Sequence, residues 1–146
     1  MLPTASIQAG RGTAMTAADR LRVLIIDHDR RVRRGLIDLL TTETDLEICA
    51  TAGSPRTALA HISTQRPDVA LLDVLLPDPA QGLSLLQKLH TLGLPVVVLT
   101  TAVSLRDQAQ QSGAAAFLEK DGNLHLIPQA LRAAAAQANP KTRRQR

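Results

Sequence analysis

The sequence has almost no aromatic residues and only one cysteine. Its 146 residues include no tryptophan or tyrosine and a single phenylalanine, so a folded core must be built from leucine, valine, isoleucine and alanine. Cys49 has no second cysteine to pair with, which excludes an internal disulfide and is compatible with a reducing compartment. The N-terminal twenty residues contain no continuous apolar stretch, so they resemble neither a signal peptide nor a membrane span. We therefore expect one domain with an aliphatic core.

The positive charge of the chain is concentrated at its C-terminal end. The formal net charge is +4, from seventeen lysines and arginines against thirteen acids. Four of these cations lie in the last six residues: Lys141, Arg143, Arg144 and Arg146. We interpret residues 139–146 as a basic disordered tail, for which weak contact with nucleic acid is the alternative role. Residues 1–20 are interpreted as a disordered leader, in which Met15 is a second candidate start.

Between residues 21 and 138, short β-rich runs alternate with amphipathic helical stretches. The expected strands are residues 22–27, 47–52, 69–73, 96–100 and 115–120. The expected helices begin after Asp29 and after Ser54, and then span residues 82–92, 105–112 and 124–138. This alternation predicts an α/β domain with a five-stranded parallel sheet covered on both faces. Right-handed crossovers favour a flavodoxin-like doubly wound fold with strand order 2-1-3-4-5.

Polar side chains stand at the ends of four of the five expected strands, namely Asp27, Asp73, Thr100 and Lys120. Each alone has an ordinary explanation as a helix cap, a loop carboxylate, a β-former or a solvated lysine. In an open parallel sheet, however, these strand ends meet at the edge where ligands bind. A carboxylate there can attack a phosphoryl group, while lysine and threonine bind its oxygens and a hard cation such as Mg²⁺ neutralises them. The four residues together predict a site that accepts a phosphoryl group.

The motifs VLIIDHD, PDVALLDVLLP, VVVLTT and FLEKDG occur in this order along the five units. In order and spacing the chain resembles the receiver domain of bacterial two-component response regulators over residues 21–138. The motifs LLDVLLP and LEKDG are similar to those of receivers that precede a helix-turn-helix output domain. The resemblance implies a cytoplasmic, non-enzymatic protein of phosphorelay signalling, whose Asp73 is phosphorylated by a histidine kinase or a phosphotransfer protein. We expect a stand-alone receiver, with a truncated regulator as the alternative.

The resemblance also assigns roles to individual residues. Asp27, Asp73 and the backbone carbonyl of Leu75 are expected to bind Mg²⁺. Thr100 is the expected switch hydroxyl and Lys120 the expected phosphate contact. Phe117 occupies the position of a rotating aromatic switch. The fourth helix, fifth strand and fifth helix would form the output surface or a homodimer interface.

The chain departs from the receiver pattern at His28, where the family normally has a second metal-binding acid. Imidazole is a poorer ligand for Mg²⁺, so either phosphorylation continues with an altered metal preference or the protein is a pseudo-receiver that binds partners without cycling phosphate. Asp29 lies one residue further on, and its orientation stays open. The segment 77–82 is one residue longer than usual. Four arginines open the first helix and are interpreted as a solvated face, with kinase docking as the alternative: Arg30, Arg31, Arg33 and Arg34.

A third hypothesis is enzymatic. Asp27-His28-Asp29 after an apolar strand also resembles the D-x-D start of haloacid-dehalogenase-like phosphatases, in which Asp27 would be the nucleophile. That family expects further acids after the lysine, and here only Asp121 is available. The hypothesis also leaves the spacing from Asp73 to Pro77 unexplained.

Overall fold

The computed structural model of the protein describes residues 16, 19–122 and 124–138, and it contains one parallel sheet of five strands. The strand order is β2-β1-β3-β4-β5, as the sequence predicted. The strands are β1 (Leu21–Ile26), β2 (Leu46–Ala52), β3 (Val69–Leu72), β4 (Val96–Thr100) and β5 (Ala116–Glu119). Each boundary lies within one residue of its prediction. Asp27, Asp73 and Lys120 were predicted as terminal strand residues and instead follow directly after their strands.

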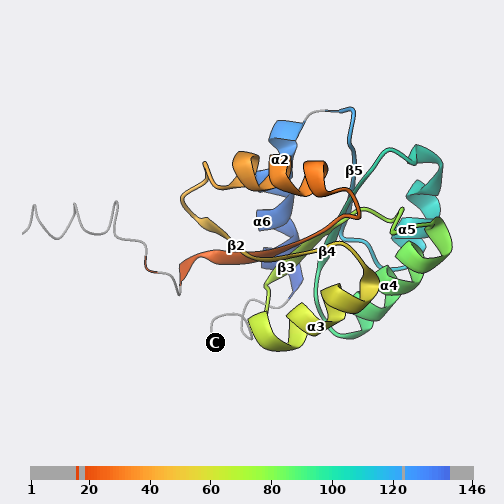
Figure 1. Ribbon diagram of the computed structural model, residues 1–146, viewed down its shortest axis with the longest axis horizontal. Coiled ribbons are helices and arrows are strands. Elements are labelled where there is room, and N and C mark those ends of the chain that lie inside the picture. Colours follow the sequence, from red (N-terminus) through yellow and green to blue (C-terminus); the bar gives the residue numbers. More distant parts are fainter. Residues whose placement is uncertain (1–15, 17–18, 123, 139–146) are drawn as a thin grey trace, which may run out of the picture.

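Helices cover both faces of the sheet (Figure 1). They are α2 (Arg30–Leu40), α3 (Pro55–Gln65), α4 (Pro79–Thr91), α5 (Arg106–Gln111) and α6 (Ile127–Ala138). On one face, Val23 and Ile25 of β1 pack in a cluster with α2 and α6. On the other face, Leu24 and Ile26 pack in a cluster with α3, α4 and α5. The strands read as continuous apolar runs because both of their faces are buried.

The helix starts follow local capping rules. Ser54 caps α3 by accepting a hydrogen bond from the Thr57 N–H, and Pro55 stands at the first helical position, as predicted. Asp29 caps α2 in the same way. Asp78 caps α4, which begins at Pro79 rather than at the predicted residue 82. The segment 77–82, predicted as a long loop, is therefore mostly the first turn of α4.

Gly82 lets α4 pack directly on the segment that follows β3. A Cβ atom at Gly82 would lie 1.6 Å from the carbonyl oxygen of Val74, the residue after Asp73. Helix α4 then runs to Thr91, and Gly93 follows with a φ of 82°, in the left-handed region that favours glycine. The close approach at Gly82 fixes the backbone beside Asp73.

The last two helices begin with 3₁₀ turns. Residues Val103–Leu105 precede α5, and residues Leu124–Leu126 precede α6, so both α-helices start later than predicted. Pro128 is the second residue of α6, where its missing N–H costs little. The predicted basic tail and nearly all of the predicted leader lie outside the described residues. Within the described part of the chain, no helix combines the length and apolarity that crossing a membrane requires.

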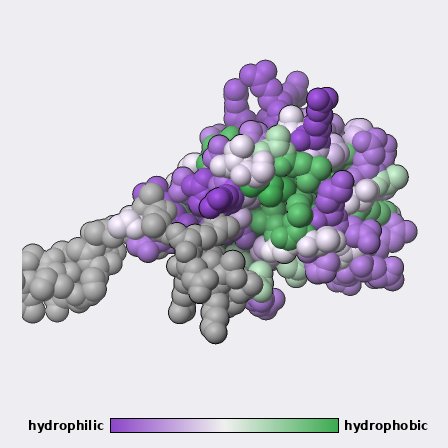
Figure 2. All heavy atoms as spheres, turned by 90° about the horizontal axis from the view of Figure 1, so that it is seen from below, coloured by the Kyte–Doolittle hydropathy of each residue, from purple (hydrophilic) through white to green (hydrophobic). Residues whose placement is uncertain are grey.

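The outer surface of the α3 and α4 side is partly apolar. Figure 2, which views the molecule from below Figure 1, shows apolar side chains gathered between hydrophilic ones. A shallow groove of about 380 Å³ lies between these two helices, and Leu59 and Leu85 are among the residues that line it. The sheet edge that carries the strand-end polar residues is a separate feature, described next.

Candidate functional site

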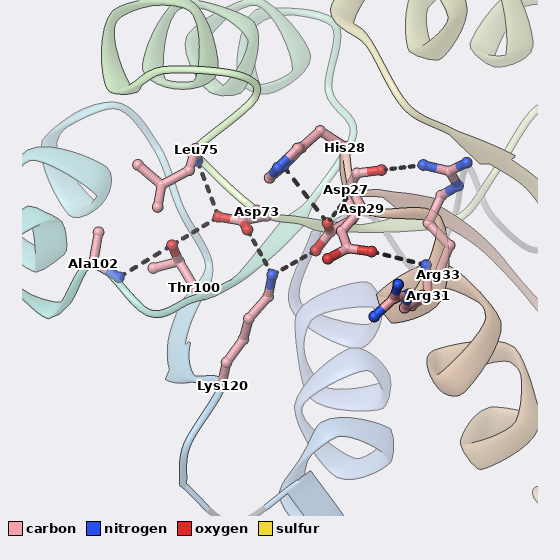
Figure 3. A network of polar contacts seen from close by, with 10 residues as sticks. All are labelled: Asp27, His28, Asp29, Arg31, Arg33, Asp73, Leu75, Thr100, Ala102 and Lys120. Carbon is pink, nitrogen blue, oxygen red and sulfur yellow. Dashed lines mark hydrogen bonds and ion pairs between the residues drawn. The ribbon is translucent and has the colours of Figure 1, made fainter.

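The four polar residues predicted to converge do meet at the C-terminal edge of the sheet (Figure 3). Asp27 follows β1, Asp73 follows the central strand β3, Thr100 ends β4 and Lys120 follows β5. Asp27, Asp73 and Thr100 are the buried polar residues of the described chain, each at most 3% exposed. Burial of two carboxylates requires partners that compensate their lost hydration.

Asp73 is held by contacts to both of its carboxylate oxygens. Its Oδ1 accepts hydrogen bonds from the Leu75 N–H at 2.9 Å and from the Thr100 hydroxyl at 2.7 Å. Its Oδ2 accepts a hydrogen bond from the Lys120 ammonium at 2.7 Å. The carboxylate therefore has a fixed orientation, with a hydroxyl and a cation on opposite oxygens.

Lys120 also bridges to the second buried carboxylate. Its Nζ lies 2.8 Å from Asp27 Oδ2. Burial alone would lower the pKa of Lys120, but its hydrogen bonds to Asp27 and Asp73 and their negative charges raise that pKa above the usual value. Lys120 is therefore a permanent cation that neutralises part of the charge of this carboxylate pair.

Asp27 is fixed from two further directions. Its Oδ1 accepts a hydrogen bond from the Asp29 N–H at 2.9 Å, and its backbone carbonyl accepts one from Arg33 Nη1 at 2.7 Å.

Arg33 was predicted to be part of a solvated arginine patch, and for this residue the prediction is wrong. Its side chain is half-buried, whereas Arg30, Arg31 and Arg34 are exposed.

The sequence does contain a signal for this inward arginine. Arg33 precedes the buried residues Leu36 and Leu40 by three and seven positions, so the three share one face of α2. The sequence also places four arginines close together at the start of this helix, and that clustering favours a solvent-exposed face for all of them.

His28 lies at the rim of the same site. Its Nδ1 is 3.9 Å from Asp27 Oδ1, and its side chain is 53% exposed. Ligand atoms of Asp27, His28 and Asp73 all lie within 4.8 Å of one another, and no other such cluster occurs among the described residues. The two carboxylates suit Mg²⁺, which prefers oxygen ligands, whereas the imidazole suits it poorly.

Asp29 does not replace the acid that is missing at position 28. Its carboxylate accepts a hydrogen bond from the Arg31 N–H at 2.8 Å and so caps α2. This bond holds the pKa of the exposed Asp29 carboxyl below its usual value. Asp29 therefore caps the helix and is not part of the cluster formed by Asp27, His28 and Asp73.

Leu75 and Phe117, the remaining predicted residues, have different surroundings. Leu75 contacts Asp73 through its N–H, and metal binding by its carbonyl stays a prediction. Phe117 lies in β5, is 7% exposed and belongs to the cluster on the α3–α5 face rather than to the polar network. The Arg106 guanidinium lies 4.6 Å from the centre of its ring and 3.7 Å from Glu119. Rotation of Phe117 as a switch also stays a prediction.

Comparison with known proteins identifies the family of the chain. The profile of the response regulator receiver domain matches residues 23–132. The chain is 37% identical to the DNA-binding transcriptional activator DevR/DosR of Mycobacterium tuberculosis, over 69% of this chain and 48% of that protein. It is 33% identical to the transcriptional regulatory protein UhpA of Salmonella typhimurium, over 86% of this chain and 72% of that protein. The chain thus spans about half the length of DevR/DosR.

A solved structure shows the same fold. The signal receiver domain of the putative response regulator NarL from Mycobacterium tuberculosis superposes with a TM-score of 0.71 at 29% identity, covering 82% of this chain and 98% of that one. Receiver domains interact with histidine kinases and with output domains or other partners, and they generally bind Mg²⁺ at acidic residues. The match to the family profile, the relatives and the sheet order agree, and the chain belongs to the response regulator receiver domain family.

Proposed function

We propose that the protein accepts a phosphoryl group on Asp73 from a phosphohistidine of a histidine kinase or phosphotransfer protein, and that this phosphorylation switches partner binding. The observation that carries the proposal is the placement of the Asp73 carboxylate between the Thr100 hydroxyl and the Lys120 ammonium. A hydroxyl and a cation are the donors that an incoming phosphoryl group needs. We expect no turnover of an external substrate, and a cytoplasmic location follows from the proposed donors.

The transfer is a displacement at phosphorus. One carboxylate oxygen of Asp73 forms a bond to phosphorus as the bond between phosphorus and the donor nitrogen breaks, and the leaving imidazole keeps the electron pair. Lys120 and Thr100 then bind phosphoryl oxygens in place of the carboxylate oxygens they contact now. Asp27 and Asp73 would hold a divalent cation, with the Leu75 carbonyl as a further ligand, and that cation would supply charge neutralisation at the phosphoryl oxygens.

Intact mass spectrometry tests the proposal. The protein is incubated with acetyl phosphate and either Mg²⁺ or Mn²⁺, and we expect an adduct with the mass of one phosphoryl group. Asp73→Asn should abolish this adduct. Asp29→Asn is the matched control, because asparagine also caps helices and the Asp29 carboxylate is not part of the Asp27, His28 and Asp73 cluster, so it should keep the adduct. An adduct that survives in Asp73→Asn would contradict the proposal.

A pseudo-receiver is the second candidate. His28 stands where a metal-binding acid is expected, and Lys120 already neutralises charge on both buried carboxylates. Absence of any adduct with every cation and donor tried, in a protein that still binds a partner, would favour this candidate. The phosphatase hypothesis loses support because the carboxylate of Asp29, the second acid of its motif, caps α2 and is not part of the cluster with Asp27 and Asp73.

We further propose that α5, β5 and α6 form the surface that binds a downstream protein or a second copy of the chain. The 3₁₀ turns on this side carry exposed apolar residues, with Val103 49% and Leu126 42% exposed. Contact with nucleic acid would involve the basic residues 139–146. Hydrogen exchange measured with and without the phosphoryl group should change in α5, β5 and the turn before α6. A change confined to α3 would argue against this surface.

A further inference from the structure

The imidazole of His28 lies beside the two buried carboxylates of the site. Its Nδ1 faces Asp27 Oδ1 at 3.9 Å, and the pair lies beside Asp73 (Figure 3). In transition-metal sites, bonds of about 2.0–2.2 Å to nitrogen and oxygen put two ligand atoms between roughly 3 and 4 Å apart. The 3.9 Å between the imidazole and the carboxylate falls within that range, and the ligand atom of Asp73 lies within 4.8 Å of both.

The backbone that carries His28 is held on both sides. The Asp27 carbonyl accepts a hydrogen bond from Arg33, and the Asp29 N–H donates to the Asp27 carboxylate. The side chain of His28 itself remains half-exposed, so turning it onto an ion at the rim requires no new burial. The hydrogen bonds on either side of His28 therefore hold its backbone in place at the rim.

Lys120 contacts only one oxygen of each buried carboxylate. Its ammonium contacts the Oδ2 atoms of Asp27 and Asp73. The atom facing His28 is the other oxygen of Asp27, Oδ1, which also accepts a hydrogen bond from the Asp29 N–H. A carboxylate oxygen accepts more than one bond, so an ion between Oδ1 and the imidazole does not require Lys120 to leave.

We infer that His28 makes this site selective for a first-row transition-metal ion over Mg²⁺. Two carboxylates and one imidazole form a mixed oxygen and nitrogen donor set, which binds ions such as Co²⁺ and Zn²⁺ more tightly than Mg²⁺, whereas a set of oxygens alone suits Mg²⁺. The inference rests on the proposed function, because it names the metal class of the same phosphoryl-accepting site.

Metal titration without a phosphodonor tests this selectivity. Co²⁺ is added to the whole chain and its visible absorption reports the geometry and donor set of the bound ion, while calorimetry measures Co²⁺ and Mg²⁺ binding. We expect Co²⁺ to bind at least about tenfold more tightly than Mg²⁺. His28→Asp should lower the affinity for Co²⁺ about tenfold and change the Co²⁺ spectrum, because the donor set becomes all oxygen. The same substitution should raise the affinity for Mg²⁺.

Two further variants secure the result. His28→Ala should lower the affinity for Co²⁺ without raising the affinity for Mg²⁺. His61→Gln, on the distant helix α3, should change neither affinity, and it controls for adventitious histidine binding. Far-UV circular dichroism confirms that each variant is folded. A wild type that prefers Mg²⁺, or a Co²⁺ affinity and spectrum unchanged in His28→Asp, would overturn the inference.

Failure of the inference is distinguishable from failure of the proposed function. A phosphoryl adduct that forms with Mg²⁺, combined with no preference for Co²⁺, overturns the inference and leaves the function standing. Preferential Co²⁺ binding through His28, combined with no adduct under any cation, supports the inference and overturns the function.

Discussion

Lys120 is the residue on which the charge balance of the site depends. Its ammonium lies within 2.8 Å of one oxygen from each of two buried carboxylates. Two carboxylates this close to one another repel, and little water reaches them. The site is therefore stable because the lysine stays charged, which agrees with the raised pKa of Lys120.

Removing this cation should destabilise the fold. We expect Lys120→Met to lower the free energy of unfolding by about 2 kcal/mol, since it leaves buried carboxylates without their cation. Adding Asp73→Asn should recover about 1 kcal/mol of that loss, because one of the two charges is then gone. Urea unfolding followed by circular dichroism measures the free energy of unfolding of the single and the double variant, since the chain has no tryptophan for fluorescence. Lys88→Met, at an exposed lysine of α4, is the control, and an equal effect there would contradict the account.

Arg33 is expected to act as a positioning residue. Its hydrogen bond to the Asp27 carbonyl fixes the segment that carries Asp27 and His28, and a Cβ atom at Gly53 would lie only 3.0 Å from its Nη1. We expect Arg33→Met to weaken metal binding and slow phosphorylation of Asp73 severalfold while the protein stays folded, because the carboxylate loses its fixed direction.

The matched control for Arg33 is its exposed neighbour Arg34. Arg34→Met removes the same charge from the same helix but no contact to Asp27. Metal affinity from calorimetry and the rate of adduct formation should be unchanged in Arg34→Met. Equal effects of the two substitutions would show that total charge matters rather than the carbonyl contact.

At the scale of elements, the packing of α4 against the end of β3 depends on Gly82. A Cβ atom there would overlap the Val74 carbonyl oxygen. We expect Gly82→Ala to lower the free energy of unfolding by about 3 kcal/mol, because helix and loop must move apart. Gly35→Ala is the control, since a Cβ atom at Gly35 meets nothing within 4 Å, and it should raise stability by about 0.5–1 kcal/mol through helix propensity. Chemical denaturation measures both, and a neutral Gly82→Ala would contradict the close approach.

A second contact between elements is the ion-pair cluster that ties α6 to the loop before β2. Arg132 donates to both carboxylate oxygens of Asp45, at 2.7 and 2.8 Å, and also contacts Glu43. The hydrogen bond from Arg132 holds the pKa of the Asp45 carboxyl below its usual value. The stability that Asp45 contributes is therefore present above its unfolded pKa and lost as pH falls through the lower, folded pKa.

We expect Arg132→Gln to lower the free energy of unfolding at neutral pH by about 0.5–1 kcal/mol, a modest value because the pair is about one-third exposed. The difference between wild type and variant should shrink as pH falls below about 4, where Asp45 is protonated first in the unfolded chain, and should vanish below the lower folded pKa. Thermal unfolding across pH measures this difference. A difference that is constant down to acid pH would show that lost packing, not charge, explains the effect.

At the scale of the whole molecule, the sheet and the convergence of the site could be predicted from sequence. Apolar runs mark the strands because both faces of a parallel sheet are buried, and chain crossovers then restrict the strand order. Asp27, Asp73, Thr100 and Lys120 were predicted to meet because the carboxyl ends of parallel strands share an edge.

The contacts that orient these residues could not be predicted in the same way. The spacing of Arg33 to Leu36 and Leu40 places it on the inner face of α2, but it does not indicate which backbone carbonyl its side chain contacts. Whether Asp29 caps a helix or enters the site depends on one backbone turn. The prediction began this helix at Gly82, whereas Asp78 caps it and Pro79 is its first residue.

The most direct test of the central claim is to locate the phosphoryl group on the chain. Protein treated with acetyl phosphate and a divalent cation is reduced with borohydride, which converts an acyl phosphate of aspartate to homoserine, and its peptides are analysed by mass spectrometry. The account predicts homoserine at position 73 and at no other acid. Homoserine at Asp27, or an adduct with no modification of Asp73, would contradict it.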